Sequence, residues 1–199
     1  MLDNKKVLVA GCGGLGGYIV EMTARLGVGT ILVCDGDCFS QSNMNRQLYC
    51  TVETIGKPKA LCAENRWPGQ VTAFCSFIDK SNAAELISGC DAVIDALDNA
   101  ESRLILLEEC ENQGIPFVHG AIGDTNIQVC AITPGNRDIL DYIYKGRTTG
   151  KTATFSYTPA CCASMQVALA HKILKGEEID SRTLYIADLD SMDFEELKL

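Results

Sequence analysis

The sequence predicts an α/β fold in which a mostly parallel sheet carries helices on both faces, within one domain over residues 1–199. Short β-branched apolar runs alternate with longer segments of helical periodicity, which is typical of buried parallel strands and their crossover helices. A glycine-rich turn follows the first of these runs, and an aspartate follows the second. Together these observations favour a Rossmann-like sheet with right-handed crossovers.

The expected elements follow from the spacing of apolar residues. Short apolar runs predict strands at residues 6–10, 30–34, 71–77, 92–95, 116–119, 126–133 and 183–187. Apolar residues at helical spacing predict helices at residues 15–26, 55–66, 101–113 and 161–175. Residues 135–158 have neither pattern, and their Gly, Thr, Tyr and basic residues predict an irregular loop that crosses over the site.

The acidic composition excludes a general nucleic-acid binder. The chain has 26 Asp and Glu against 17 Lys and Arg, a formal net charge of −9. Phosphate backbones are instead bound by a surplus of basic residues. No signal peptide or membrane-spanning stretch is visible, so we expect a cytoplasmic protein that does not bind a membrane.

The cysteines point to the same compartment. Eleven of them are scattered through the expected core elements, where a free thiol acts as a small buried hydrophobe, and this indicates a reducing environment. No pair has Cys-x-x-Cys spacing, and the only two histidines, His119 and His171, are far apart. We therefore expect no structural zinc.

A glycine-rich loop lies between the first strand and the first helix, at Gly11, Gly13, Gly14 and Gly16. Glycines in this place permit a tight turn and a close approach of the backbone to a phosphate. The helix N-terminus adds amide donors and a partial positive charge. The loop therefore predicts a bound nucleotide, although a strand-to-helix turn without a ligand can have the same glycines.

Two carboxylates follow the second expected strand. Asp35 lies where a carboxylate can accept both hydroxyls of a ribose, and its alternative is a solvated or helix-capping role. Asp37 has three possible roles: it can cap a helix, orient Arg46 or bind a metal.

Basic and amide side chains come next and suit a triphosphate. The guanidinium of Arg46 can bind phosphate oxygens with two parallel hydrogen bonds, and the amide of Asn43 can add a neutral donor. Lys59 is expected one turn into a helix, from where it can reach the same phosphates, whereas Lys57 is expected to face solvent. The alternative for Arg46 is an exposed surface position.

Asp98 follows the fourth expected strand, at the edge where open α/β sheets place ligands. A carboxylate beside a triphosphate is a plausible ligand for Mg²⁺, which prefers oxygen donors shared with phosphate. The alternative is that Asp98 or Asn99 caps the next helix. Arg103 is expected to pair with glutamates of that helix.

In this order and spacing, these motifs resemble the ubiquitin-activating-enzyme superfamily, and most closely its bacterial ThiF/MoeB/HesA proteins. The resemblance covers about residues 5–175, and residues 166–174 are similar to the closing helix of the family. The motifs that carry it are Gly11-x-Gly13-Gly14-Leu15-Gly16, Asp35-x-Asp37, Ser42-Asn43-Met44-Asn45-Arg46-Gln47, Gly56-x-Pro58-Lys59 and Asp95-x-x-Asp98-Asn99.

The resemblance implies a fold of the adenylation-domain type, ATP and Mg²⁺ as cofactors, and a homodimer. It also implies an adenylyltransferase that activates the C-terminal glycine of a small ubiquitin-like sulfur-carrier protein of the thiamine or molybdopterin pathway, releasing pyrophosphate. Asp35 would hold the ribose, Asn43, Arg46 and Lys59 the triphosphate, and Asp98 the Mg²⁺. The full set expected to bind the nucleotide is Gly11, Gly13, Gly14, Gly16, Asp35, Asp37, Asn43, Arg46, Gln47, Lys59 and Asp98, with Arg46, Lys59 and Asp98 also catalytic.

Three departures from the family pattern are visible. Many relatives have an N-terminal helical segment whose Arg reaches the ATP of the partner subunit, whereas here the first strand is expected near residue 5. The paired zinc cysteines of the bacterial enzymes are missing, and residues 147–157 contain no cysteine for covalent chemistry. Cys161 and Cys162 lie nearby and are expected to be packing residues.

Other functions stay open at the sequence level. A reduced family member can bind a nucleotide or carrier as a scaffold without catalysis, and the departures favour this alternative. An NAD-dependent oxidoreductase explains the glycines and Asp35 but gives Arg46, Lys59 and Asp98 no joint task. Its proton donor is not obvious, although His119 at the end of a strand stays a candidate. Adenylation of a small molecule or tRNA modification is the fourth possibility.

Overall fold

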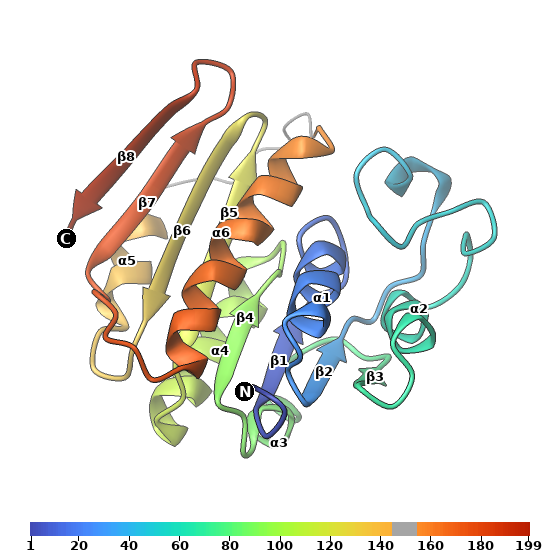
Figure 1. The fold of residues 1–199 in the computed structure, drawn as a ribbon, viewed down its shortest axis with the longest axis horizontal. Coiled ribbons are helices and arrows are strands. Elements are labelled where there is room, and N and C mark those ends of the chain that lie inside the picture. The colour runs from blue at the N-terminus through green and yellow to red at the C-terminus, as the bar shows by residue number, and fades with distance from the viewer. Residues whose placement is uncertain (145–154) are drawn as a thin grey trace.

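An eight-stranded sheet runs through the computed structural model, which describes residues 1–144 and 155–199 (Figure 1). The strands stand in the order β3-β2-β1-β4-β5-β6-β7-β8; β1 to β5 pair in parallel, and β6 to β8 add an antiparallel edge. The strands are β1 (Lys6–Ala10), β2 (Thr30–Cys34), β3 (Val71–Phe74), β4 (Ala92–Asp95), β5 (Phe117–Gly123), β6 (Asn126–Ile132), β7 (Thr183–Asp188) and β8 (Asp193–Lys198).

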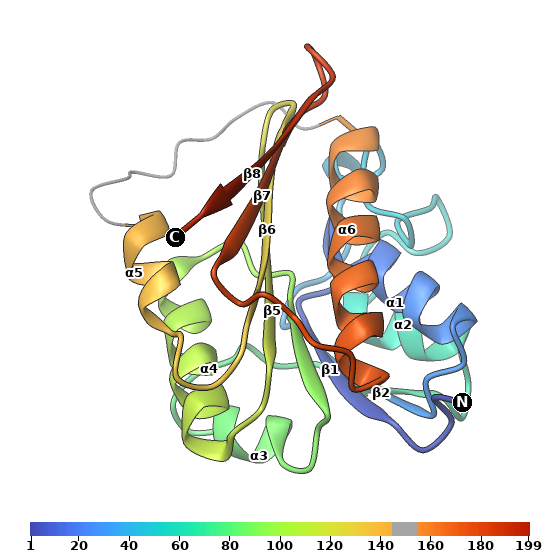
Figure 2. The same cartoon turned by 60° about the vertical axis from the view of Figure 1, so that its left-hand side comes forward.

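Helices cover both faces of the sheet, as predicted (Figure 2). The helices α1, α2 and α6 pack on one face, and α3, α4 and α5 on the other. Successive strand residues point to opposite faces, so Val7 and Val9 of β1 pack in one core and Leu8 in the other. The helices are α1 (Gly16–Arg25), α2 (Lys59–Arg66), α3 (Ala83–Ile87), α4 (Ala100–Gln113), α5 (Asp138–Tyr144) and α6 (Tyr157–Leu174), with a 3-10 turn, η1 (Gln41–Asn43).

Several elements differ from their sequence-based bounds. Part of the segment expected to be irregular forms α5, because Ile139, Leu140 and Ile143 bury an apolar face against α4 and the sheet. Residues 145–154 of the expected loop lie outside the described residues, and its last two residues, 157–158, form the start of α6, which was expected to begin at residue 161. Helix α2 begins at residue 59 and not 55, because Gly56 has a φ of +83° and Pro58 is extended.

Two elements had no sequence signal. Helix α3 spans only five residues, and β8 is a charged, exposed strand that forms by pairing with β7. Within the described ranges, the structure has no helix that is both long and apolar enough to cross a bilayer.

The direction of strand order reverses at β1, which pairs with β2 on one side and β4 on the other. Open α/β sheets bind ligands outside the carboxyl ends of the strands at such a point. Pairing between β4 and β5 ends at Ile94 and Val118, whereas β5 continues to Gly123 alongside β6. The fold therefore opens a cleft between the end of β4 and the β5–β6 hairpin.

Candidate nucleotide site

The cleft has a volume of about 1190 Å³. Small-molecule sites commonly measure about 300–1,000 Å³, so this one has room for a nucleotide and part of a second ligand. All the residues predicted to bind the nucleotide line it except Gly16 and Asn43. Those that line it are Gly11, Gly13, Gly14, Asp35, Asp37, Arg46, Gln47, Lys59 and Asp98.

The glycine loop closes the cleft beneath α1. Gly11 has a φ of +96°, and a Cβ added there would lie 2.6 Å from the carbonyl oxygen of Ala96. A Cβ at Gly16 would lie 2.0 Å from the Gly11 oxygen, so Gly16 lets the helix start against the loop and does not line the cleft. No side chain caps the N-terminus of α1, which leaves its amide donors to a ligand such as a phosphate.

Asp35 is held in place by backbone amides. Its Oδ2 accepts a hydrogen bond from the Cys12 amide at 2.7 Å, and its Oδ1 accepts one from the Asp37 amide at 2.8 Å. Burial raises the pKa of Asp35, and these two amides and the positive charge of Lys59 oppose that shift. Each oxygen keeps a second lone pair, so both can accept from ribose hydroxyls.

Asp37 has a partner that the sequence did not indicate. Its Oδ2 lies 3.0 Å from the Nζ of Lys59, and its backbone oxygen accepts from the Lys59 amide at 2.9 Å. Lys59 is the first residue of α2, not a residue one turn into it. Among the described residues the Asp37 side chain caps no helix and instead holds Lys59, while its metal-binding alternative stays a prediction.

The segment before α2 supplies only part of what was predicted. Asn43 lies outside the cleft lining, because its Oδ1 accepts from the backbone and the hydroxyl of Ser40 and so closes the 3-10 turn. Arg46 does line the cleft, while its Nη1 donates to the Ser42 carbonyl at 3.0 Å and to Asn45 Oδ1 at 2.8 Å. The guanidinium of Arg46 is therefore at the cleft, and hydrogen bonds within its own segment restrain it.

Gln47 is buried under the glycine loop. A Cβ at Gly13 would lie 3.6 Å from its Nε2, and its Oε1 has no hydrogen-bond partner among the described residues. A buried polar atom without a partner is costly, so Gln47 is a candidate for contact with a ligand or a water.

Asp98 is exposed at the end of β4, and its side chain has no hydrogen-bond partner in the described chain. The cap of α4 is Asn99, whose Oδ1 accepts from the Ser102 amide at 2.8 Å, so capping does not account for Asp98. Within the described residues there is no group of three or more metal-ligating side chains. The carboxylate of Asp98 is of the type that binds Mg²⁺, which usually takes one or two carboxylates together with phosphate oxygens and water.

Two residues at or near the wall of the cleft differ from what the sequence led us to expect. Arg103 pairs with Asp95 of β4, at 2.5 Å from Nε to Oδ2, and not with a glutamate of its own helix. His119 lies inside β5 with no exposed surface, and its Nδ1 is 2.8 Å from the same carboxylate. Burial lowers the pKa of His119, and the residue does not reach the cleft, so it cannot serve an oxidoreductase there.

Sequence analysis did not predict the remaining residues that line the cleft. Phe77 and Ile78 follow β3, and the ring of Phe77 lies against Gly36. Ile122, Ile127 and Ile186 form an apolar half over β5, β6 and β7. Apolar strand residues are the ordinary content of a sheet core, so no sequence signal distinguished these positions.

All cysteines are free thiols. Burial raises the pKa of Cys161 and Cys162, which favours the protonated thiol over the reactive thiolate at both positions. The expectation that they are packing residues agrees with their contacts in the core beneath α6.

The fold and this cleft define a nucleotide-binding protein of the adenylation-domain type. The chain belongs to the ThiF family, whose model matches residues 1–199. It is 33% identical to the SAMP-activating enzyme E1 of Haloferax volcanii, over 98% of this chain and 76% of that protein. It is also 35% identical to the sulfur carrier protein ThiS adenylyltransferase of Bacillus subtilis, over 90% of this chain and 57% of that protein.

Solved structures agree on the fold. The crystal structure of E. coli MccB with ATP matches 99% of this chain and 64% of its own, with a TM-score of 0.81 and 19% identity. The chain thus spans about three fifths to three quarters of the length of these proteins. The comparisons confirm the predicted family, fold and enzyme class, and they favour an adenylyltransferase over an NAD-dependent oxidoreductase.

Proposed function

We propose that this protein is an ATP- and Mg²⁺-dependent adenylyltransferase that activates the C-terminal glycine carboxylate of a small ubiquitin-like sulfur carrier. One observation carries the proposal: Asp35, Lys59 and Asp98, from three separate strand ends and helix starts, line one cleft at the topological switch point. The relatives that act on SAMP or on sulfur-carrier proteins support the same class of acceptor.

In this proposal Asp35 accepts from the ribose hydroxyls, and the amides of the glycine loop bind phosphate oxygens. Lys59, already held by Asp37, and Arg46 add positive charge along the triphosphate. Asp98 binds the Mg²⁺, which neutralises charge on the phosphates. Gln47 offers its unpartnered Oε1 beneath the loop.

In this reaction the protein mainly positions the two ligands, and its side chains form no covalent bond to them. An oxygen of the acceptor carboxylate forms a bond to the α-phosphorus, and the bond from that phosphorus to the bridging oxygen breaks. Pyrophosphate leaves with the electron pair, so no side chain needs to move a proton. The protein lowers the barrier by aligning the two ligands and stabilising negative charge.

The acceptor tail fits the apolar half of the cleft, over Ile122, Ile127 and Ile186. We also propose that the protein works as a homodimer in the cytoplasm, as the resemblance implies.

A nucleotide- or carrier-binding scaffold is the second candidate. One observation favours it: Asn43 and Arg46 are bound within their own segment.

Exchange of labelled pyrophosphate into ATP tests the enzyme directly. We expect exchange that depends on a carrier ending in glycine and on Mg²⁺, and no exchange with the same carrier lacking its last residue. Arg46→Ala should abolish exchange while a carrier complex survives. Tight ATP binding without exchange for any cognate carrier would leave the scaffold as the better account.

A further inference from the structure

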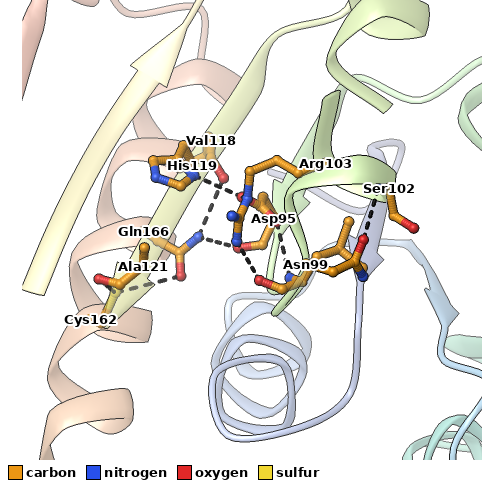
Figure 3. Close-up of polar contacts among 10 residues, drawn as sticks. Asp95, Asn99, Ser102, Arg103, Val118, His119, Ala121, Cys162 and Gln166 are labelled. Carbon is orange, nitrogen blue, oxygen red and sulfur yellow. Dashed lines mark hydrogen bonds and ion pairs between the residues drawn. The ribbon is translucent and has the colours of Figure 1, made fainter. Parts of the chain in front are cut away.

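A buried ion pair forms part of the wall of the cleft, which Arg103 lines. Arg103 of α4 and Asp95 of β4 are 4% and 0% exposed, and Figure 3 shows their side chains meeting beside His119 and Gln166. A buried ion pair is weak as a source of stability, because removing two charges from water offsets most of their attraction. Its geometry therefore matters more than its net energy.

The pair is attached to the backbone of one residue, Leu97. Asp95 Oδ1 accepts from the Leu97 amide at 3.0 Å, and Arg103 Nη2 donates to the Leu97 carbonyl oxygen. That carbonyl belongs to the peptide unit joining Leu97 to Asp98. Arg103 thus fixes the orientation of the peptide plane that precedes Asp98.

The end of β4 is supported from the other face of the sheet as well. Gln166 of α6 donates from Nε2 to the Asp95 carbonyl at 2.7 Å and to the Val118 carbonyl at 3.3 Å. A Cβ at Gly120 would lie 2.2 Å from the Gln166 side chain, so glycine there makes room for it. These bonds occupy the place where β4 and β5 stop pairing.

Asp98 itself has no such support. Its side chain is exposed and makes no hydrogen bond to the described residues, so its direction depends on its backbone. The backbone is fixed on its N-terminal side by the Arg103–Asp95 pair and on its C-terminal side by the Asn99 cap of α4.

We propose that Arg103 is a positioning residue: by holding the Leu97 carbonyl while paired with Asp95, it aims the Asp98 carboxylate at the metal of a bound metal–nucleotide complex. This inference rests on the proposed role of Asp98. Arg103 needs its forked guanidinium for the task, because one group must reach both a carboxylate and a carbonyl, which the single ammonium of a lysine does poorly.

Arg103→Lys is the test variant, and His119→Asn is its matched control, because both residues contact Asp95 Oδ2 but Arg103 is the one that donates to the Leu97 carbonyl oxygen. The binding measurement is an electron-paramagnetic-resonance titration of Mn²⁺ with a non-hydrolysable ATP analogue. We expect Arg103→Lys to weaken Mn²⁺ binding about tenfold and to leave binding of the analogue without metal unchanged. His119→Asn should leave both unchanged.

Hydrogen exchange in the ligand-free protein gives a second readout. Arg103→Lys should speed exchange in the peptide containing Leu97 and Asp98, and His119→Asn should not. If Arg103→Lys does not fold, Asp95→Asn breaks the same ion pair with almost no change in volume and should show the same two effects.

A double-mutant cycle then separates positioning from general destabilisation. In an Asp98→Asn background, Arg103→Lys should cause no further loss of Mn²⁺ affinity. Additive losses, or no Mn²⁺ binding by the wild-type protein with the analogue, would overturn the inference. Normal metal binding without pyrophosphate exchange would instead count only against the proposed function.

Discussion

Lys59 and Asp37 form an ion pair in which one partner is buried and the other faces the cleft. The Nζ and Oδ2 atoms are 3.0 Å apart, and the side chains are 9% and 55% exposed respectively. The lysine side chain is buried, and the Asp37 carboxylate holds its ammonium at the cleft wall. The charge is therefore oriented before any ligand arrives, which is the arrangement that electrostatic stabilisation of phosphate requires.

Replacing this lysine should damage catalysis far more than stability. We expect Lys59→Met to lower kcat/KM for ATP by about 10²–10³, because one positioned charge is lost from the transition state. Lys57→Met is the matched control, since Lys57 lies two residues away and is exposed. Steady-state pyrophosphate exchange measures both variants, and equal losses in the two would contradict the assignment.

Phe77 is expected to hold the base of the nucleotide. Its side chain is 67% exposed, yet its ring packs against Gly36, where an added Cβ would lie 2.7 Å from it, and it lines the cleft beside Asp35. Stacking of an aromatic ring on a base contributes about 1–3 kcal/mol. Phe77→Ala should therefore raise KM for ATP about tenfold or more and leave kcat near its wild-type value.

The control for this change is Phe194→Ala, at a similarly exposed phenylalanine of β8. Neither variant should lower the melting temperature appreciably, because little buried apolar area is lost. Isothermal titration with an ATP analogue gives the affinities, and an unchanged affinity in Phe77→Ala would exclude stacking.

The sequence was sufficient for features that depend on strand ends. Asp35 comes directly after β2 and Asp98 lies three residues beyond the end of β4, and such strand ends meet at one edge of a sheet. It was insufficient for Asn43, because a side chain that can bind phosphate can equally close its own turn. It was also insufficient for Asp95, Arg103 and His119, whose contact joins β4, α4 and β5 only after the sheet has formed.

His119 should give the protein a pH-dependent stability. Burial lowers the pKa of His119 in the folded state, so as the pH falls the unfolded chain binds the proton first. The free energy of unfolding should then decrease below about pH 6.5, the ordinary histidine value, by up to about 1.4 kcal/mol per pH unit until the folded pKa is reached.

Urea unfolding between pH 5 and 8 measures this slope. His119→Asn should flatten it, whereas His171→Asn, at the partly exposed histidine of α6, should retain the wild-type slope. A slope unchanged in His119→Asn would mean that another group binds the proton.

Substitutions at two glycines with similar φ angles distinguish the cost of a positive φ from the cost of a close contact. Gly11 and Gly135 have φ values of +96° and +94°, but a Cβ at Gly11 would lie 2.6 Å from the Ala96 carbonyl oxygen, whereas Gly135 has nothing within 4 Å. Gly135→Ala should lower the free energy of unfolding by about 1 kcal/mol, because only the unfavourable positive φ contributes there. Gly11→Ala should cost more, because the loop must also move away from the end of β4, and it should weaken binding of the ATP analogue as well. Urea unfolding and titration calorimetry measure the two effects; equal losses of stability would show that the contact between the glycine loop and Ala96 is not tight.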